Sequence, residues 1–574
     1  MKRTFSTTVL IILALALNIQ SFVVAQQKHP PQSPVGSTTG KPAPGPGTTR
    51  NRNLRTNSPA IPLIERDFDE ALKVIQQNYV DGRKIDYNVA FKSSIIGMLR
   101  SLDPHSNFYD REEYDELKND QRSEYFGIGA SIQSFLTGDK PDTFITATFD
   151  NSPASRAGLR FGDRILAVDG TKMTGKSSLE VRDKIRGPRG SIVKLTVERA
   201  SDKSTQTVEI TRDAVPQPSI ADAYLVKPGI GYVDMTRGFN YSTTEELQDA
   251  LSMLQANGAK SLVLDLRNNP GGFLDQAIFV AEMFLPSGQL ILTQKGRNGL
   301  RDNTYISRNR APNPIPLVIL INESTASASE IVAGAMQDHD RAVIVGETSF
   351  GKGLVQSIIP LDFGGALTLT SAKYYTPSGR LIQRDYSDNS LYDYYTHGGS
   401  KRLDAQPQKT KPAGPEKKTD TGRVVYGGGG IDPDETVTAK TLTMAQRRLL
   451  SPVFAFAREL TNGRIANVSS HKVPGGINFE HELQPDEFLV DDTIFKAFKN
   501  FVDNEPTFKS LAPLVDRNRA FIEVQLRFNI VTAAYGRQMG DRVFILTDDQ
   551  QVAKAIDVLP RARDLAATRK QPQP

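Results

Sequence analysis

The sequence contains no cysteine, and its six histidines are scattered without an HExxH arrangement. The absence of cysteine excludes disulfide bonds, thiolate catalysis and cysteine-based metal sites. The histidine pattern argues against a zinc hydrolase. We therefore expect a protein without a metal or another cofactor. At 574 residues, the chain is long enough for several domains with sizeable cores.

A basic excess is also missing from most of the chain. The formal net charge is +5, but residues 1–62 hold seven Lys and Arg residues and no Asp or Glu. The remainder holds 63 basic and 65 acidic residues, so its net charge is about −2. A protein that grips a phosphate backbone needs a basic surface. We therefore expect no nucleic-acid partner.

Long apolar runs are absent beyond the N-terminus. Lys2 and Arg3 precede the apolar run Val9–Leu17, and Val23–Ala25 offers a small-residue cleavage site. This pattern is typical of a secretory signal peptide over residues 1–25, and the run is short for a bilayer span. We expect an extracytoplasmic, periplasmic protein that contacts the membrane only through this segment. An uncleaved membrane anchor is the alternative.

The rest of the chain divides by composition and by hydrophobic period. A stretch rich in Pro, Gly, Ser and Thr predicts a disordered linker, and a polar stretch without periodicity predicts a flexible insertion. The predicted segments are a signal peptide (1–25), a disordered linker (26–62), an N-terminal helical domain (63–118), a β-rich domain (119–213), an α/β domain (214–384), a flexible insertion (385–425), a completion of the α/β domain (426–445) and a helical C-terminal region (446–574).

Strands and helices alternate over residues 214–384, which predicts an α/β layer with largely parallel strands. The predicted strands are 231–234, 261–266, 316–321 and 341–345, and the predicted helices are 243–255, 274–284 and 328–337.

Lys352 lies in the stretch GETSFGKG, which is almost a P-loop. A P-loop continues with Ser or Thr, which binds magnesium, and then opens a helix onto the phosphate. Here Gly353 follows the lysine, and residues 354–370 have the composition of β-strands. The sequence therefore argues against nucleotide binding. A lysine can serve instead as a base, because burial lowers the pKa of an amine and a neutral amine can accept a hydroxyl proton.

A serine-rich turn, Asn322–Glu330, lies between the predicted strand 316–321 and the predicted helix 328–337. A hydroxyl at such a turn lies near backbone N–H groups that the helix leaves unpaired. The alternative is a capping box, in which Ser327 caps the helix and Glu330 reaches back. Three serines lie in this turn, so the residues alone do not single out a nucleophile.

Leu264–Gly272, with the sequence LDLRNNPGG, is an apolar strand that ends in a flexible turn. Such a turn can direct backbone N–H groups at a developing oxyanion. The alternative is a plain connection from a strand to a helix.

Together these three stretches resemble the C-terminal processing peptidases, which are also called tail-specific proteases. The resemblance rests on Thr325–Ser329 and on FGKG at residues 350–353. It implies that Ser327 is the nucleophile and that Lys352, 25 residues later, is the general base. Thr325 is the main departure, because relatives often have Ser there.

The same resemblance implies further site residues. Gln356 would position the lysine, and Asp338 would have a supporting role. The N–H of Ala328 and the N–H of Gly271 or Gly272 would form the oxyanion hole.

Residues 119–213 resemble a PDZ domain of the protease-associated type. The matching segments are Tyr125–Gly129, Ser152–Gly158 and Gly162–Gly170. The first segment implies a carboxylate-binding loop, beside which an extended peptide adds as a strand along Gly129–Gln133. The implied peptide-binding residues are Phe126, Gly127, Ile128 and Gly129.

The implied fold is α/β and multidomain: a helical N-terminal domain, a PDZ β-domain, a ClpP/crotonase-like α/β protease core and a helical C-terminal region. The implied function is a secreted serine endopeptidase that binds exposed apolar C-terminal tails and cleaves through a Ser/Lys dyad and an acyl-enzyme. A non-catalytic PDZ scaffold, or a chaperone-like peptide binder, is the alternative. An adaptor that delivers substrates and a homo-oligomer both stay open.

Overall fold

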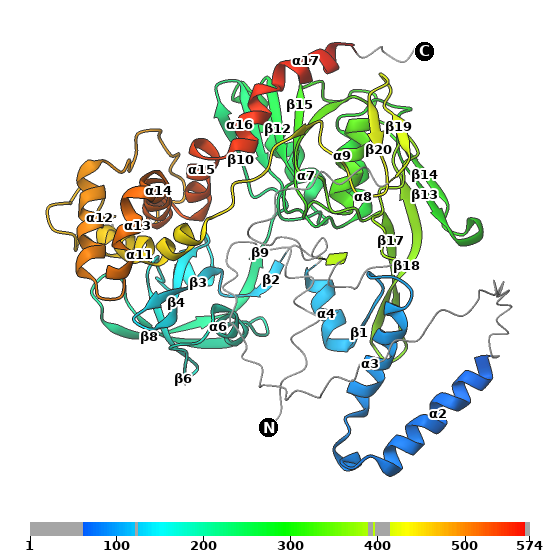
Figure 1. Cartoon of the computed structure of the whole chain (residues 1–574), viewed down its shortest axis with the longest axis horizontal. Coiled ribbons are helices and arrows are strands. Elements are labelled where there is room, and N and C mark those ends of the chain that lie inside the picture. Colours follow the sequence, from blue (N-terminus) through cyan, green and yellow to red (C-terminus); the bar gives the residue numbers. More distant parts are fainter. Residues whose placement is uncertain (1–60, 121–123, 388–393, 396–413, 474, 569–574) are drawn as a thin grey trace, which may run out of the picture. The chain divides into compact units, whose positions relative to one another are not determined.

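The computed structural model describes residues 61–120, 124–387, 394–395, 414–473 and 475–568 (Figure 1). The chain divides into two compact units, residues 1–108 and 109–574. The predicted signal peptide and almost all of the predicted linker lie outside the described residues, as does most of the predicted insertion.

The first unit is helical where it is described, as the apolar spacing predicts. Helix α2 (Ile61–Asn78) is followed by a short 3-10 turn and by α3 (Tyr87–Arg100). Helix α3 begins after Asp86, whose carboxylate accepts the backbone N–H groups of Asn88 and Val89 and so caps the helix. A short strand, β1 (Asn107–Tyr109), ends this part of the chain.

The second unit begins with α4 (Arg111–Asp120) and continues into a small β-domain. Its antiparallel sheet has the strand order β3-β4-β5-β7-β8, with β6 paired to β5, so β3 is an edge strand. A separate pair joins β2 to β9. The elements are β2 (Glu124–Gly127), β3 (Ala130–Thr137), β4 (Lys140–Thr148), α5 (Pro153–Arg156), β5 (Arg164–Val168), β6 (Thr171–Lys172), α6 (Ser178–Ile185), β7 (Ile192–Glu198), β8 (Thr205–Thr211) and β9 (Asp213–Pro216).

The central sheet has the strand order β10-β11-β12-β15-β16-β21. Only β10 is antiparallel to its neighbour, which confirms the predicted parallel layer. Every residue of β12, β15 and β16 is buried, which explains their unbroken apolar runs, because both faces of the sheet are covered. The strands are β10 (Asp222–Lys227), β11 (Ile230–Asp234), β12 (Ser261–Asp265), β15 (Leu317–Ile321), β16 (Ala342–Gly346) and β21 (Glu435–Thr436).

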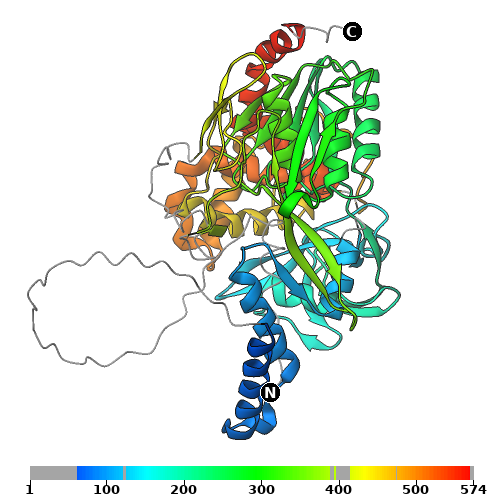
Figure 2. The same ribbon diagram turned by 90° about the vertical axis from the view of Figure 1, so that its right-hand side faces the viewer.

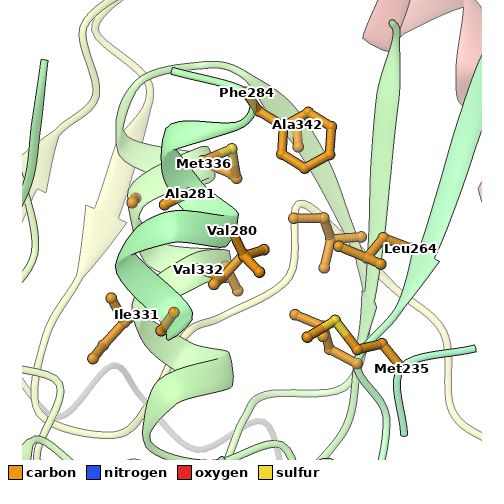
Figure 3. Close-up of a cluster of buried hydrophobic side chains, with 14 of the residues drawn as sticks. Met235, Leu264, Val280, Ala281, Phe284, Ile331, Val332, Met336 and Ala342 are labelled. Atoms are coloured by element: carbon orange, nitrogen blue, oxygen red, sulfur yellow. The ribbon is translucent and has the colours of Figure 1, made fainter. Parts of the chain in front are cut away.

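Three helices cover one face of this sheet: α7 (Thr243–Ala256), α8 (Leu274–Glu282) and α9 (Ala328–Asp338). Figure 3 shows Val280 of α8 and Val332 of α9 directed toward Leu264 of β12. These helices match the predicted ones to within two residues at each end.

Helices α16 (Gln550–Asp557) and α17 (Leu559–Thr568) cover the other face. Their Val552 and Leu559 belong to one buried cluster with Val263 of β12, whereas the neighbours of Val263 in sequence face α8 and α9. Figures 1 and 2 show the red C-terminal helices and the green core helices on opposite sides of the strands.

The chain that follows Lys352 forms part of an antiparallel sheet. Strand β17 pairs with β18, and β18 also pairs with β13, which pairs with β14. A strand therefore follows the lysine, where a P-loop would have a helix. The strands are β13 (Leu290–Gly296), β14 (Asn303–Ile306), β17 (Leu354–Pro360) and β18 (Ala366–Tyr375).

The prediction of a flexible insertion over 385–425 is wrong for its last part. Strands β19 (Glu416–Lys418) and β20 (Val424–Tyr426) form a hairpin. Arg423, beside that hairpin, forms ion pairs with Asp340 and Asp434 of the core. These long-range contacts order a segment whose polar, aperiodic sequence gives no local signal of structure.

The C-terminal region is helical, as predicted. Its helices α11 to α14 form a core with the β-domain, in which Phe454 of α11 stacks on Phe135 of β3 with ring centroids 3.8 Å apart. Arg458 of α11 donates to the carbonyl of Gly162 at 2.7 Å. These contacts fix the β-domain against the C-terminal helices. The helices not yet delimited are α11 (Met444–Thr461), α12 (Asp492–Asn504), α13 (Ala512–Val515), α14 (Arg519–Tyr535) and α15 (Arg537–Thr547).

Candidate active site

Ser327 lies on a sharp turn between β15 and α9, where it is the N-cap residue of α9. Its backbone has φ 57° and ψ −116°, a conformation that costs an L-residue about 1–3 kcal/mol. A residue keeps such a conformation only where its surroundings impose it. The side chain is half-buried, and the turn presents it at the start of the helix.

The surroundings that impose this turn include Thr325. The Thr325 side chain is fully buried; its hydroxyl donates to the carbonyl of Leu266 at 2.8 Å and accepts the N–H of Asn322 at 2.9 Å. The departure from the family pattern at this position therefore keeps the hydroxyl that ties the serine turn to the end of β12.

Glu330 holds the serine turn and the lysine loop together. Its carboxylate is fully buried, and one oxygen accepts the N–H groups of Ser327 and Lys352 at 2.8 and 2.9 Å. The other oxygen accepts the N–H of Gly351 at 2.7 Å and the hydroxyl of Ser349 at 2.5 Å. Burial raises the pKa of the Glu330 carboxyl, and these four hydrogen bonds oppose the rise. The capping box is thus present, and Glu330 does more than cap a helix.

Tyr374 of β18 forms a second bridge between the same two segments. Its hydroxyl lies 2.6 Å from the carbonyl oxygen of Lys352 and 3.1 Å from that of Ser327. Burial raises the pKa of the Tyr374 phenol well above its usual range, so the hydroxyl keeps the proton that it donates. Two independent bridges therefore bring the backbones of Ser327 and Lys352 together.

The glycines beside Lys352 allow close packing of its loop. A Cβ on Gly353 would lie 2.9 Å from the backbone nitrogen of Gln383, and a Cβ on Gly351 would lie 3.1 Å from that of Gly430. The Lys352 side chain is half-buried. The two glycines serve packing of the lysine loop, and no phosphate-binding helix start follows.

The two candidate oxyanion glycines have different surroundings. A Cβ on Gly271 would lie 2.7 Å from the Cβ of Ser327 and 2.8 Å from the nitrogen of Ala328, so Gly271 is the glycine that lies against the serine turn. Its N–H is donated to the Asn269 side chain at 2.9 Å. This N–H can serve an oxyanion only if it leaves or shares that acceptor. Gly272 lies against the backbone of Phe239.

Gln356 and Asp338 bond to residues other than the dyad. The Gln356 amide donates to the hydroxyl of Thr370 at 3.2 Å, so its contact with Lys352 stays a prediction. Asp338 forms a buried ion pair with Arg380 at 2.7 Å. It ends helix α9, about 16 Å along the helix from Ser327. Its supporting role in the site stays a prediction.

The four predicted peptide-binding residues lie where the β-domain begins. Phe126 and Gly127 belong to β2, and the Ile128 side chain packs into the core of the β-domain. Gly129 has φ 71°, and a Cβ there would lie 2.3 Å from the Cβ of Ser152. Helix α6 lies beside β3, because Ser178 at its start donates to Ser134 of β3 at 2.9 Å.

Sequence reasoning missed the bridging roles of Glu330 and Tyr374 and the place of Asn269. Glu330 was visible only as the acid of a capping box, and Asn269 only as part of a turn. Tyr374 has no local signal, since it is one aromatic residue in a β-strand.

Metal binding and membrane insertion have no structural support in the described residues. Within that part of the chain, no group of three or more His, Asp or Glu side chains is arranged to hold a metal ion. None of the described helices combines the length and apolar character that a bilayer-spanning segment needs.

Comparison with known proteins shows which family the chain is similar to. The model of peptidase family S41 matches residues 229–388, and a PDZ domain model matches residues 144–199. The chain is 38% identical over 327 residues to a carboxy-terminal-processing protease of Bartonella bacilliformis, covering 55% of this chain and 72% of the relative. It is 33% identical over 319 residues to the carboxy-terminal processing protease CtpA of Bacillus subtilis, covering 55% of this chain and 67% of that relative.

Among solved structures, the photosystem II D1 C-terminal processing protease is 30% identical, with a TM-score of 0.33, over 54% of this chain and 88% of that one. From its sequence relatives, the chain belongs to peptidase family S41, as a serine-type carboxyl-terminal processing protease with a PDZ domain.

Proposed function

We propose that this protease acts outside the cytoplasm, binds the exposed apolar C-terminal tail of a protein through its PDZ domain, and cleaves the polypeptide with a Ser327/Lys352 dyad. The observation that carries the proposal is the double bridge between these two residues. Glu330 accepts both of their N–H groups, and the Tyr374 hydroxyl lies within hydrogen-bonding distance of both of their carbonyl oxygens.

The dyad follows the logic of serine proteases with one residue fewer. The Ser327 hydroxyl oxygen attacks the scissile carbonyl while the neutral Lys352 amine accepts its proton. The resulting ammonium protonates the leaving amine, which leaves an acyl-enzyme. The amine then takes a proton from water, and the hydroxide attacks the acyl-enzyme. The ammonium returns that proton to the Ser327 oxygen as the new carboxyl terminus leaves. In this proposal the N–H of Ala328, at the start of α9, stabilises the oxyanion together with a glycine of Gly271–Gly272.

This chemistry requires a deprotonated amine. An ordinary lysine has a pKa of about 10.4 and is almost fully protonated at neutral pH. The proposal therefore requires that the pKa of the Lys352 amine lies well below this value when substrate is bound. Arginine cannot replace it, because a guanidinium keeps its proton at working pH.

Tail binding is supported by the position of β3 at the edge of the PDZ sheet. Strand β3 pairs with β4 on one side and is the terminal strand of its sheet. An extended peptide can add to such an edge through backbone hydrogen bonds, with its carboxylate at the turn of Ile128 and Gly129.

The test is cleavage of a loosely folded reporter protein that carries an apolar C-terminal tail. The parent should cleave it, whereas Ser327→Ala, Lys352→Ala and Lys352→Arg should show no cleavage while keeping the parent's circular dichroism and affinity for the tail. A parent that binds the tail without cutting the reporter would instead be a peptide-binding scaffold. Cleavage by Ser327→Ala at the rate of the parent would disprove the dyad.

Export is tested separately by the N-terminus of the mature protein. We expect mass spectrometry of the protein from an extracytoplasmic fraction to find Gln26 as the first residue. Retention of residues 1–25 in a membrane fraction would favour the anchored alternative.

A further inference from the structure

The loop that carries the oxyanion glycines is bonded to a distant helix. Arg267 directly precedes this loop, and its side chain is largely buried. Part of its guanidinium binds the carboxylate of Asp265, through Nε at 2.9 Å. Its Nη1 lies 2.8 Å from both the Asp549 carboxylate and the Gln551 side-chain oxygen, at the start of α16. Arg267 thus joins the loop to a helix 284 positions further along the chain.

The C-terminal partners of Arg267 are themselves held in place. One oxygen of Asp549 caps α16 by accepting the N–H groups of Gln551 and Val552, while its other oxygen faces Arg267. The Gln551 amide donates to the carbonyl of Val437 at 2.7 Å, and only 1% of the residue is exposed. Helix α16 packs on the central sheet through Val552. The acceptor group that Arg267 meets is therefore rigid.

The bonds continue from Arg267 to the nucleophile turn. Asn268 has φ 60° and exchanges two hydrogen bonds with Asn322, at 2.8 and 2.9 Å. Asn269 accepts the N–H of Gly271 and, through its backbone carbonyl, that of Ala326, both at 2.9 Å. Gly271 in turn lies against Ser327. A small rotation of the peptide at Arg267 would thus be transmitted to the glycine that faces the nucleophile.

We propose that Asp549 and Gln551 are positioning residues for proteolysis, which hold the oxyanion loop in its working geometry through Arg267. This inference rests on the proposed function of Ser327 and of the glycine loop. The bond from Arg267 to the Asp265 carboxylate, two positions away, would by itself stabilise only a local turn. The partly buried carboxylate of Asp549 adds an anchor on a separate element, and charge-assisted bonds to a guanidinium are strong and directional. The C-terminal helices therefore act on the rate of acyl transfer, although they contribute no reacting atom.

Asp549→Asn tests the proposal. Asparagine is as good an N-cap as aspartate, so α16 stays capped while Arg267 loses an ionic partner. Asp548→Asn is the matched control, because Asp548 is the neighbouring residue, is about half exposed and pairs with Lys440 on the surface. The readouts are kcat and KM for the tailed reporter, the acylation rate from single-turnover cleavage of the reporter, the thermal unfolding midpoint, and deuterium exchange in the peptide spanning residues 266–273.

We expect Asp549→Asn to lower kcat and the acylation rate about tenfold, with KM unchanged and faster exchange in the loop peptide. Asp548→Asn should leave all of these at parent values. An Asp549→Asn protein with parent kcat and parent loop exchange would overturn the proposal, as would a lower unfolding midpoint with no change in acylation. The parent and Ser327→Ala are measured beside them. If Ser327→Ala cleaves as well as the parent, the proposed function fails, and the loop exchange still reports on the anchor.

Discussion

The carboxylate of Glu330 accepts the backbone N–H of Ser327 at 2.8 Å, within a fully buried site. This bond holds the serine in a backbone conformation that an L-residue otherwise avoids. Because the same oxygen also accepts the N–H of Lys352, one carboxylate sets the positions of both dyad backbones.

Glu330→Gln should therefore disturb both dyad residues at once. The amide keeps the shape of the side chain, but its NH₂ group would face N–H or O–H donors where the carboxylate had an acceptor. We expect a loss of about 1.5–3 kcal/mol in the free energy of unfolding and a fall in kcat of about 10- to 100-fold. Chemical denaturation and reporter cleavage measure these, with the exposed Glu245→Gln as control. Parent kcat in Glu330→Gln would refute the positioning role.

Tyr374→Phe removes the second bridge and keeps the ring in the core. The carbonyl oxygens of Ser327 and Lys352 would lose a shared donor, which costs about 1 kcal/mol of stability. We expect kcat to fall about tenfold, since the serine and lysine segments are then free to shift. Tyr375→Phe is the control, because its ring lies under Lys295 and bridges neither carbonyl. Equal kcat values for the two variants would contradict this account.

Gly271→Ala tests the close approach of the oxyanion loop to the nucleophile. Its Cβ would lie 2.7 Å from both the Ser327 Cβ and the carbonyl oxygen of Ala326, so either the loop or the serine must move. We expect the acylation rate to fall at least about 100-fold. Gly288→Ala separates this effect from backbone strain, because Gly288 has nearly the same φ, 93° against 94°, and open space around it. Similar acylation rates in the two variants would show that crowding at Ser327 is not the cause.

Asp234 should give the folding stability a pH dependence. Burial raises the pKa of Asp234 to about 6, and the negative charge of the nearby Asp265 is the second cause of this rise. A carboxyl with a raised pKa binds its proton more tightly in the folded state, so the free energy of unfolding should rise as pH falls from about 7 to about 4. The contribution is about 1–3 kcal/mol, fully present below pH 4 and lost as pH rises through 6.

Asp234→Asn should flatten this pH dependence, because an amide does not titrate. Urea denaturation at a series of pH values between 4 and 7 measures the slope, with the exposed Asp249→Asn as the comparison. If the slopes of Asp234→Asn and the parent coincide, the pH dependence has another source.

Much of the fold could be predicted because its signals are local. The apolar runs of β12, β15 and β16 indicate buried parallel strands, and helix α14 lies in the predicted helical C-terminal region. The β-hairpin of residues 416–426 could not be predicted in this way. Its order depends on ion pairs between Arg423 and core carboxylates, and these leave no periodic pattern in the sequence.

The candidate site likewise has features that the local sequence predicts and features that it does not. The strand-to-helix turn of Ser327 and the glycine-flanked Lys352 could be recognised from residue types and spacing. The roles of Glu330 and Tyr374 could not be recognised in this way. Glu330 bonds to Lys352, 22 positions away, and Tyr374 bonds to Lys352 and Ser327, 22 and 47 positions away.

Local periodicity predicts the order of the elements, and short motifs that resemble a known family indicate the candidate dyad. The three-dimensional fold, in contrast, brings a buried carboxylate and a buried phenol to the two dyad segments and places α16 against Arg267. Such contacts are selected by burial, which makes an unpaired charge or hydroxyl costly and so requires a partner, however distant in sequence.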